Sequence, residues 1–286
     1  MKIGAMVESF RLGFRGGVEK AASLGIEGIQ AYATYGDLCV DTVTDEQLKI
    51  ALDIVKSNGL VFSAICGDFG HGFMNEDNNK IYVEKSKRVL DLAKKLECNI
   101  VTTHIGTVPA EENKTTEIMR KACRELAEYA DSVGSAFAVE TGPEPGETLA
   151  NFLDSLGAGG VRVNFDPANL VMCVDDRPEN ALKYLGKYVV HTHAKDGIML
   201  KKKIEEKISV GEEAKEHQAL ADMGMKYLEL PLGAGDVNFD VYLPALAETG
   251  FNGFLTIERE VGDSPERDIA LAVDFLKEKI NKYNLG

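Results

Sequence analysis

The segment AFAVETGPEPGETLANFLDSLGAGGVRVNFD (residues 136–166) contains two short apolar runs, at residues 136–141 and 161–166, on either side of a helical pattern at residues 147–156. Short apolar runs rich in β-formers predict buried strands, and the longer amphipathic pattern predicts a helix. Strands that alternate with helices pair in parallel, because the helix carries the chain back to the starting edge. The segment therefore predicts one strand–helix–strand unit of an α/β protein.

The same alternation recurs along the whole chain. Six more strands are predicted, at residues 2–8, 27–32, 60–66, 99–105, 188–194 and 253–258. Further helices are predicted at residues 15–24, 45–58, 78–97, 111–133, 177–186, 239–249 and 264–282. Thr44 and Gln47 have the spacing of a capping box, and Ser264 followed by Pro265 is typical of a helix start. Eight such units fit a closed (β/α)₈ TIM barrel better than an open sheet.

One interval in this pattern is longer than the others. His193 and Glu258 are 65 positions apart, whereas the two preceding intervals between strand ends are 26 and 27. We therefore expect an insertion after the seventh strand, at about 198–230, with a charged helical or loop structure. Segments that follow barrel strands lie over the active-site mouth, so a lid or a subunit contact is expected. Since no Pro/Gly/Ser-rich linker divides the chain, residues 1–286 are predicted to form one domain.

The overall composition excludes several classes of protein. Acidic residues outnumber basic ones by 46 to 32, and a net charge of −14 disfavours nucleic-acid binding. The basic run at residues 201–203 is followed by Glu205 and Glu206, which indicates a solvated helix face. No signal peptide and no membrane-length apolar run is visible, so a soluble cytoplasmic protein is expected. The five cysteines lack C-x-x-C spacing, which predicts reduced thiols.

Four predicted strands end in a single ionisable residue. These residues are Glu140, Asp166, His193 and Glu258. The carboxyl ends of all strands in a parallel barrel meet at one face, so these side chains are expected to converge. Carboxylates with one imidazole suit a single divalent ion such as Mn²⁺, Co²⁺, Mg²⁺ or Zn²⁺. The alternative is a set of salt bridges and core histidines, but three crowded acids without a cation would raise one another's pKa.

These residues lie in motifs that resemble the xylose isomerase-like sugar isomerases and epimerases, whose relatives include the tagatose/psicose 3-epimerases and the inosose dehydratases. The motifs are VETGPEPGET (139–148), NFDPANL (164–170), HTHAKD (191–196), PLGAGDVNFDVYLPAL (231–246) and TIERE (256–260). The resemblance covers nearly the whole chain in strand order. It implies that Glu140, Asp166, His193 and Glu258 bind the metal, with His193 preferred to His191 because the family's ligand precedes Lys-Asp by two residues.

The sequence also departs from the family pattern. Asn169 stands where epimerases and abasic-site endonucleases of this fold have the histidine of D-x-x-H, and Gln30 stands where the second strand often ends in glutamate. The missing histidine argues against a three-zinc DNA-repair site. Relatives of this fold commonly assemble, so the resemblance allows a homodimer or a homotetramer.

The predicted chemistry follows from the charge of the metal. A cation that binds a carbonyl oxygen and the adjacent hydroxyl acidifies the C–H group between them and stabilises the metal-bound enediolate. Glu140 and Glu258 come from strands separated by two others, so they are expected to flank the substrate as catalytic acid and base. The reaction is then isomerisation or epimerisation of a small sugar or sugar phosphate. The alternative is a metal-dependent dehydratase of a keto-polyol, in which a β-hydroxyl leaves.

Other polar residues are predicted to reach the mouth of the barrel. The expected substrate-binding residues are Glu8, His104, Asn169, Lys195 and Glu260. Arg259 is expected to face outward, because it alternates with Glu258 and Glu260, and His217 in the insertion is expected to be solvated. The glycines of residues 233–235 weakly resemble a phosphate cradle, and the alternative is a simple turn before Asp236.

Overall fold

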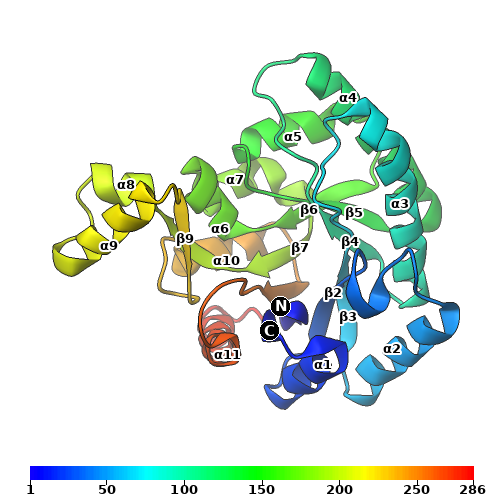
Figure 1. The fold of residues 1–286 in the computed structure, drawn as a ribbon, viewed down its shortest axis with the longest axis horizontal. Coiled ribbons are helices and arrows are strands. Elements are labelled where there is room, and N and C mark those ends of the chain that lie inside the picture. The colour runs from blue at the N-terminus through cyan, green and yellow to red at the C-terminus, as the bar shows by residue number, and fades with distance from the viewer.

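A computed structural model describes all residues, 1–286, and contains the predicted barrel (Figure 1). Eight parallel strands close on one another in the order β1-β10-β7-β6-β5-β4-β3-β2. The barrel strands are β1 (Lys2–Met6), β2 (Gly28–Tyr32), β3 (Val61–Cys66), β4 (Ile100–Thr103), β5 (Ala136–Glu140), β6 (Val161–Phe165), β7 (Val189–Ala194) and β10 (Phe254–Ile257). The prediction of a (β/α)₈ barrel is therefore confirmed.

Helices surround the barrel and are connected to its strands in the expected alternation. They are α1 (Gly13–Ser23), α2 (Asp45–Ser57), α3 (Glu76–Lys95), α4 (Lys114–Val133), α5 (Gly146–Asp154), α7 (Pro178–Leu185), α10 (Phe239–Glu248) and α11 (Pro265–Tyr283). Thr44 and Gln47 form the predicted capping box at the start of α2. Ser264 precedes α11 as predicted, but its side chain makes no capping hydrogen bond. No helix combines the length and the apolar character that a membrane crossing requires.

Near the carboxyl end of the barrel, the strands lie between an apolar layer, which packs against the helices, and a polar interior. On β6, Phe165 stacks on Tyr242 of α10, with ring centroids 5.6 Å apart. On β7, Thr192 lies on the same outer side, 2.8 Å from the Tyr242 hydroxyl. Residues one position away point to the other face of a strand. Asn164 and His191 accordingly meet inside the barrel, with the Asn164 Oδ1 and His191 Nδ1 atoms 2.9 Å apart.

The insertion after β7 contains two strands that the sequence pattern did not predict. β8 (Asp196–Met199) pairs antiparallel with β9 (Tyr227–Leu230), and the chain between them forms α8 (Leu200–Glu205) and α9 (Gly211–Asp222). These two helices project from the barrel at one side (Figure 1). The prediction that His217 is solvated was wrong: the residue is buried, and its Nδ1 atom lies 2.7 Å from the Ser209 hydroxyl.

Candidate metal centre and active site

The four predicted ligands come from four neighbouring strands and meet in one place. Glu140 ends β5, Asp166 follows β6, His193 lies on β7 and Glu258 follows β10. One ligand atom of each residue lies within 4.8 Å of those of the other three, and all four residues are buried. The barrel closure thus brings together residues that are up to 118 positions apart in the sequence.

Asp166 presents one free oxygen to this cluster. The residue precedes the short helix α6 (Pro167–Asn169), and its Oδ1 atom accepts hydrogen bonds from the backbone N–H groups of Ala168 (2.8 Å) and Asn169 (3.1 Å). Those two bonds fix the carboxylate, as a helix N-cap does. The Oδ2 atom is buried and has no hydrogen-bond partner. This oxygen is therefore oriented toward the cluster and accepts no hydrogen bond from the protein.

His193 is held by its other ring nitrogen. Its Nε2 atom lies 3.2 Å from Gln30 Oε1, and Gln30 in turn donates its amide to Thr102 Oγ1 (3.1 Å). This orients Gln30 Oε1 as an acceptor for the Nε2–H group and leaves His193 Nδ1 facing the carboxylates. An imidazole that donates its remote N–H to an acceptor is the usual arrangement around a metal-ligating histidine. Gln30, noted in the sequence as a departure, thus positions a ligand candidate.

The environment of His193 Nδ1 fits a cation. This atom is buried, lacks a hydrogen-bond partner and lies 3.2, 3.6 and 3.7 Å from oxygens of Glu258, Glu140 and Asp166. Burial lowers the pKa of His193, but the carboxylates of Glu258 and Glu140 outweigh burial and raise it well above its usual value. Three carboxylates and one imidazole without a thiolate suit a hard or borderline divalent ion. The residues present therefore fit the expected single metal ion.

Glu140 accepts hydrogen bonds with both of its carboxylate oxygens. Its Oε2 accepts from the Asn164 amide (3.1 Å), and its Oε1 accepts from the Asn169 amide (2.9 Å). Asn169, predicted to contact substrate, thus uses its amide nitrogen to hold Glu140, and it also reaches the Thr141 carbonyl (3.2 Å). His104 Nε2 lies 3.4 Å from the same Glu140 oxygen.

His104, another predicted substrate contact, lies between two acids at the mouth. Its Nδ1 atom is 2.9 Å from Asp68 Oδ2, and its side chain is 44% accessible. The Glu140 carboxylate raises the pKa of His104 to about 11, so the ring is an imidazolium at neutral pH. Asp68 was not predicted to take part, although it lies two residues beyond the predicted strand at 60–66.

Lys195 lies against Glu258 on the opposite side of the site. Its Nζ atom donates to Glu258 Oε2 (3.0 Å) and Glu260 Oε2 (2.6 Å), and it lies 3.6 Å from Glu229 of β9. Lys195 is buried, whereas Glu260 is largely exposed. The Glu258 Oε1 atom makes no hydrogen bond with the protein. Glu258 therefore keeps one oxygen free next to a fixed ammonium group.

Arg259 does not face outward as predicted. It is buried, and it donates to Glu229 Oε1 (2.6 Å) and to Asp268 Oδ2 (2.8 Å). The prediction assumed strand alternation, but β10 ends at Ile257, so the period of two no longer applies beyond that residue. The buried Arg259–Glu229 pair links the end of β10 to the insertion.

His191 belongs to a layer below the cluster. Its two ring nitrogens lie 2.9 Å from Asn164 Oδ1 and 2.9 Å from Thr256 Oγ1. Burial, followed by the nearby charge of His193, lowers the pKa of His191 to about 3, so the ring is neutral. His191 therefore orients Asn164, which in turn holds Glu140. Asn164 was missed as a site residue, although it lies in the quoted motif at 164–170.

Glu8 also lies at the mouth, at the end of β1. Its Oε1 accepts from the backbone N–H of Tyr32 (3.0 Å), and its Oε2 is buried without a partner. The residue lines a pocket of about 200 Å³ together with Glu258, Tyr32 and Tyr35. Glu8 and Glu258 thus line the same pocket.

The glycine turn at residues 233–235 is not a phosphate cradle. The backbone N–H groups of Gly233 and Gly235 (3.0 Å each) and Val237 (3.1 Å) all donate to the carboxylate of Asp196. Gly235 permits this approach, since a Cβ there would lie 2.1 Å from Asp196 Oδ1. Burial raises the pKa of Asp196 to about 6, and the N–H groups oppose that rise, so Asp196 is a carboxylate at neutral pH. The turn is already occupied by an anion of the protein.

A buried carboxyl group near the mouth was not predicted from the sequence. Glu144 is only 4% exposed, accepts from the Val108 backbone N–H (3.0 Å) with Oε2 and leaves Oε1 without a partner. Burial raises its pKa to about 7. Its position inside the motif at 139–148 was the only signal in the sequence.

Glu144 is expected to make stability depend on pH. Its folded pKa exceeds the unfolded value, so its protonated form favours folding, and that contribution is lost as the pH rises from about 4.5 through 7. A shift of this size corresponds to about 3 kcal/mol. Relative to the wild type, Glu144→Gln should therefore gain about 3 kcal/mol of unfolding free energy between pH 4 and pH 8. Urea unfolding at both pH values measures this, and a pH-independent difference would contradict it.

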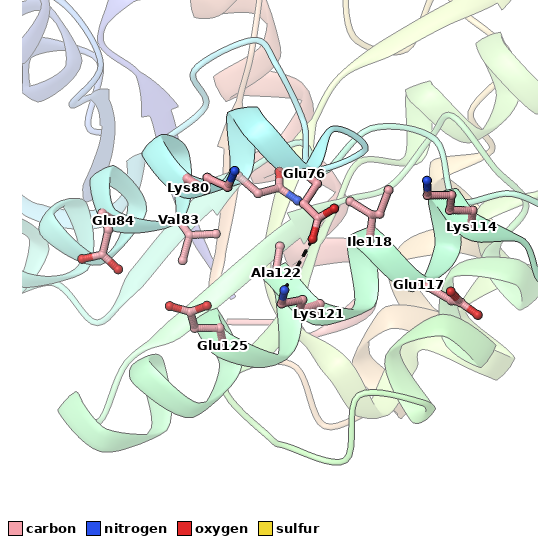
Figure 2. Close-up of a pocket in the computed structure, with 11 residues that line it drawn as sticks. Glu76, Lys80, Val83, Glu84, Lys114, Glu117, Ile118, Lys121, Ala122 and Glu125 are labelled. Carbon is pink, nitrogen blue, oxygen red and sulfur yellow. Dashed lines mark ion pairs between the residues drawn. The ribbon is translucent and has the colours of Figure 1, made fainter.

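A separate groove of about 400 Å³ lies on the outer surface, between α3 and α4 (Figure 2). Its walls carry both signs of charge, and Lys121 pairs with Glu76 across it (3.5 Å). None of the four clustered ligands lines this groove. The candidate active site is therefore the barrel mouth, where the carboxyl ends of the strands meet.

Comparison with known proteins identifies the family of the chain. Residues 18–279 match the family model described as xylose isomerase-like TIM barrel. An uncharacterised protein of Methanocaldococcus jannaschii is 26% identical over 79% of this chain and 71% of its own length.

Several solved structures share the fold. A xylose isomerase domain protein from Planctomyces limnophilus superposes with a TM-score of 0.79 and 24% identity, over 99% of this chain and 98% of its own. The probable 3-DHS dehydratase AsbF of Bacillus anthracis gives 0.75 and 18%, over 97% and 99%. A D-psicose 3-epimerase from Clostridium cellulolyticum H10 gives 0.70 and 16%, over 98% and 99%. The chain belongs to the xylose isomerase-like TIM barrel family.

Proposed function

We propose that this protein is a divalent-metal-dependent isomerase or epimerase of a small sugar or sugar phosphate, and that it removes a proton next to a carbonyl group. The observation that carries the proposal is the buried cluster in which His193 Nδ1 and Asp166 Oδ2 have no partner while two further carboxylates reach the same point. Glu140, Asp166, His193 and Glu258 would hold the metal. Epimerases among the proteins of similar fold are consistent with this chemistry.

The roles of the chain's residues follow from their contacts. When bound, the metal polarises the substrate carbonyl and hydroxyl and thereby acidifies the C–H bond between them. Glu258 accepts the proton on its free oxygen while Lys195 holds the other oxygen (3.0 Å), and the electron pair of the broken C–H bond moves toward the carbonyl oxygen. Glu140, fixed by Asn164 and Asn169, relays a proton from the His104 imidazolium (3.4 Å) to carbon from the opposite side, and exchange with solvent then restores His104 and Glu258. Return to the same carbon gives an epimer, and return to the adjacent carbon gives an isomer.

A dehydratase is the second candidate, and His104 favours it. Its imidazolium ring is exposed at the mouth, 3.4 Å from Glu140. After Glu258 has taken the α-proton, this group can protonate a β-hydroxyl, which leaves as water while the C–C double bond forms. The probable 3-DHS dehydratase AsbF has a similar fold, which is consistent with a dehydratase reaction.

Solvent exchange separates these reactions. Protein loaded with Mg²⁺ or Mn²⁺ is incubated in D₂O with ketoses, ketose phosphates and inososes, and the products are followed by NMR and mass spectrometry. Deuterium at the α-carbon with an unchanged formula is expected, and addition of EDTA should abolish it. Loss of water instead would favour the dehydratase. Absence of exchange with every compound would contradict proton abstraction.

A further inference from the structure

We propose that the substrate is an uncharged polyhydroxy ketone or aldehyde, without phosphate or carboxylate, and that Glu8 binds one of its hydroxyl groups. This inference rests on the proposed function and specifies the substrate class for the same site. The inference has two grounds. The cationic groups at the mouth are already bound by groups of the protein. One carboxylate oxygen of Glu8, beside the catalytic residues, has no hydrogen-bond partner.

The buried cations at the mouth are neutralised by acidic side chains. Lys195 contacts Glu258, Glu260 and Glu229 within 3.6 Å. Arg259 is held between Glu229 and Asp268. A substrate anion would have to displace one of these carboxylates and leave it unpaired, which is unfavourable in a buried site.

Two further basic side chains at the mouth are also engaged. His104 lies between Asp68 (2.9 Å) and Glu140 (3.4 Å). Arg11 lines the small pocket, but its guanidinium donates to the backbone carbonyls of Gly262 (3.1 Å) and Glu260 (3.0 Å). These bonds direct Arg11 toward the chain that follows β10.

The backbone offers no alternative anion site in the turn that most resembles one. Its N–H groups at Gly233, Gly235 and Val237 surround the carboxylate of Asp196. A phosphate group at the mouth would instead approach Glu258 and Glu260, which line the same pocket. Like charges brought together in a partly desolvated site repel strongly, so the pocket selects against an anionic substrate.

Glu8 has the geometry of a hydroxyl acceptor. One oxygen is fixed by the Tyr32 N–H group (3.0 Å), and the other is buried and without a partner. The rings of Tyr32 and Tyr35 are 4.7 Å apart and line the pocket with Glu8. A free carboxylate oxygen beside two aromatic rings accepts a hydroxyl hydrogen while the rings pack against the apolar C–H face of a sugar.

Matched pairs of compounds test the charge selection. Mg²⁺-loaded protein is titrated calorimetrically with D-fructose and D-fructose 6-phosphate, and with D-ribulose and D-ribulose 5-phosphate. The uncharged member of a pair should bind at least about 10-fold more tightly, because the phosphate would approach the carboxylates of Glu8, Glu258 and Glu260 in the same pocket. Equal or tighter binding of the phosphates, or no binding by any compound, would overturn the inference.

The exchange assay keeps this test distinct from that of the proposed function. An uncharged sugar that binds tightly but exchanges no proton would contradict the enzyme mechanism and leave the substrate class standing. If only a phosphorylated sugar binds and exchanges its α-proton, the proposed mechanism would stand and the proposed substrate class would be contradicted.

Two variants test the residues named. Glu8→Gln should weaken binding of the uncharged sugar by about 10-fold, because a charge-assisted hydrogen bond becomes a neutral one, without a change in the unfolding midpoint. Glu19→Gln, an exposed acid on α1, is the matched control. Glu260→Gln removes one negative charge from the pocket and one of the three acidic partners of Lys195, so it should reduce the preference for the uncharged sugar over its phosphate. An unchanged affinity in Glu8→Gln or an unchanged preference in Glu260→Gln would overturn the corresponding assignment.

Discussion

Replacing Glu258 by glutamine is expected to lower the rate of α-proton exchange by about 10²–10⁴-fold, the usual contribution of a general acid or base. The amide has nearly the same shape as the carboxylate but cannot accept a proton. Glu140→Gln should have an effect of similar size, since the proton must also be returned. Exchange rates measured by NMR at saturating metal give both values.

The fold of these variants should remain intact. Lys195 keeps Glu260 (2.6 Å) and Glu229 (3.6 Å) as partners after the loss of Glu258. Glu147→Gln is the matched control, because Glu147 lies in the same motif as Glu140 but is exposed in the first turn of α5. Circular dichroism should show no difference among the three variants. Full activity in either Glu140→Gln or Glu258→Gln would disprove the two-acid mechanism.

Among the proposed variants, Glu229→Ala is expected to lose the most unfolding free energy. Glu229→Ala leaves Arg259 buried with only Asp268 as an acidic partner, and it removes one acid from Lys195. Breaking a buried ion pair on one side costs about 3–5 kcal/mol of unfolding free energy. Urea denaturation followed by circular dichroism measures this loss.

Two further variants show whether the buried pair is the cause. Glu206→Ala changes an exposed acid of the same insertion and should alter the unfolding free energy by less than about 0.5 kcal/mol. The double variant Glu229→Leu with Arg259→Met removes both charges and should recover much of the loss, since apolar residues replace buried pairs well. A loss below about 1 kcal/mol in Glu229→Ala, the value of a surface pair, would contradict the description of a buried network.

The barrel and the convergence of the four clustered residues could both be predicted from the sequence, for one reason. Each strand contributes an apolar run followed by one ionisable residue, and parallel closure places all such residues at one face. Glu140, Asp166 and Glu258 needed only this rule, whereas the choice of His193 over His191 also used the family resemblance. Glu8 and His104 reach the same mouth in the structure for the same reason.

The parts that could not be predicted depend on contacts across long sequence separations. Arg259 lies beyond the end of β10, where the alternation of a strand does not determine its direction, and its partner Glu229 lies on a four-residue strand in the insertion. The turn at 233–235 weakly resembled a phosphate cradle, and its occupant could not be foreseen because Asp196 is 37 positions away from Gly233. His217 seemed solvated in a polar segment, yet the fold of that segment buries it against Ser209.

The most direct test of the metal centre is a crystal structure of the protein grown with Mn²⁺, with anomalous data collected at the manganese edge. We expect one anomalous peak bonded to His193 Nδ1, Asp166 Oδ2 and the carboxylates of Glu140 and Glu258, at the ligand distances typical of such ions. A mouth without an anomalous peak, or a peak bound elsewhere while these four side chains point apart, would contradict the account.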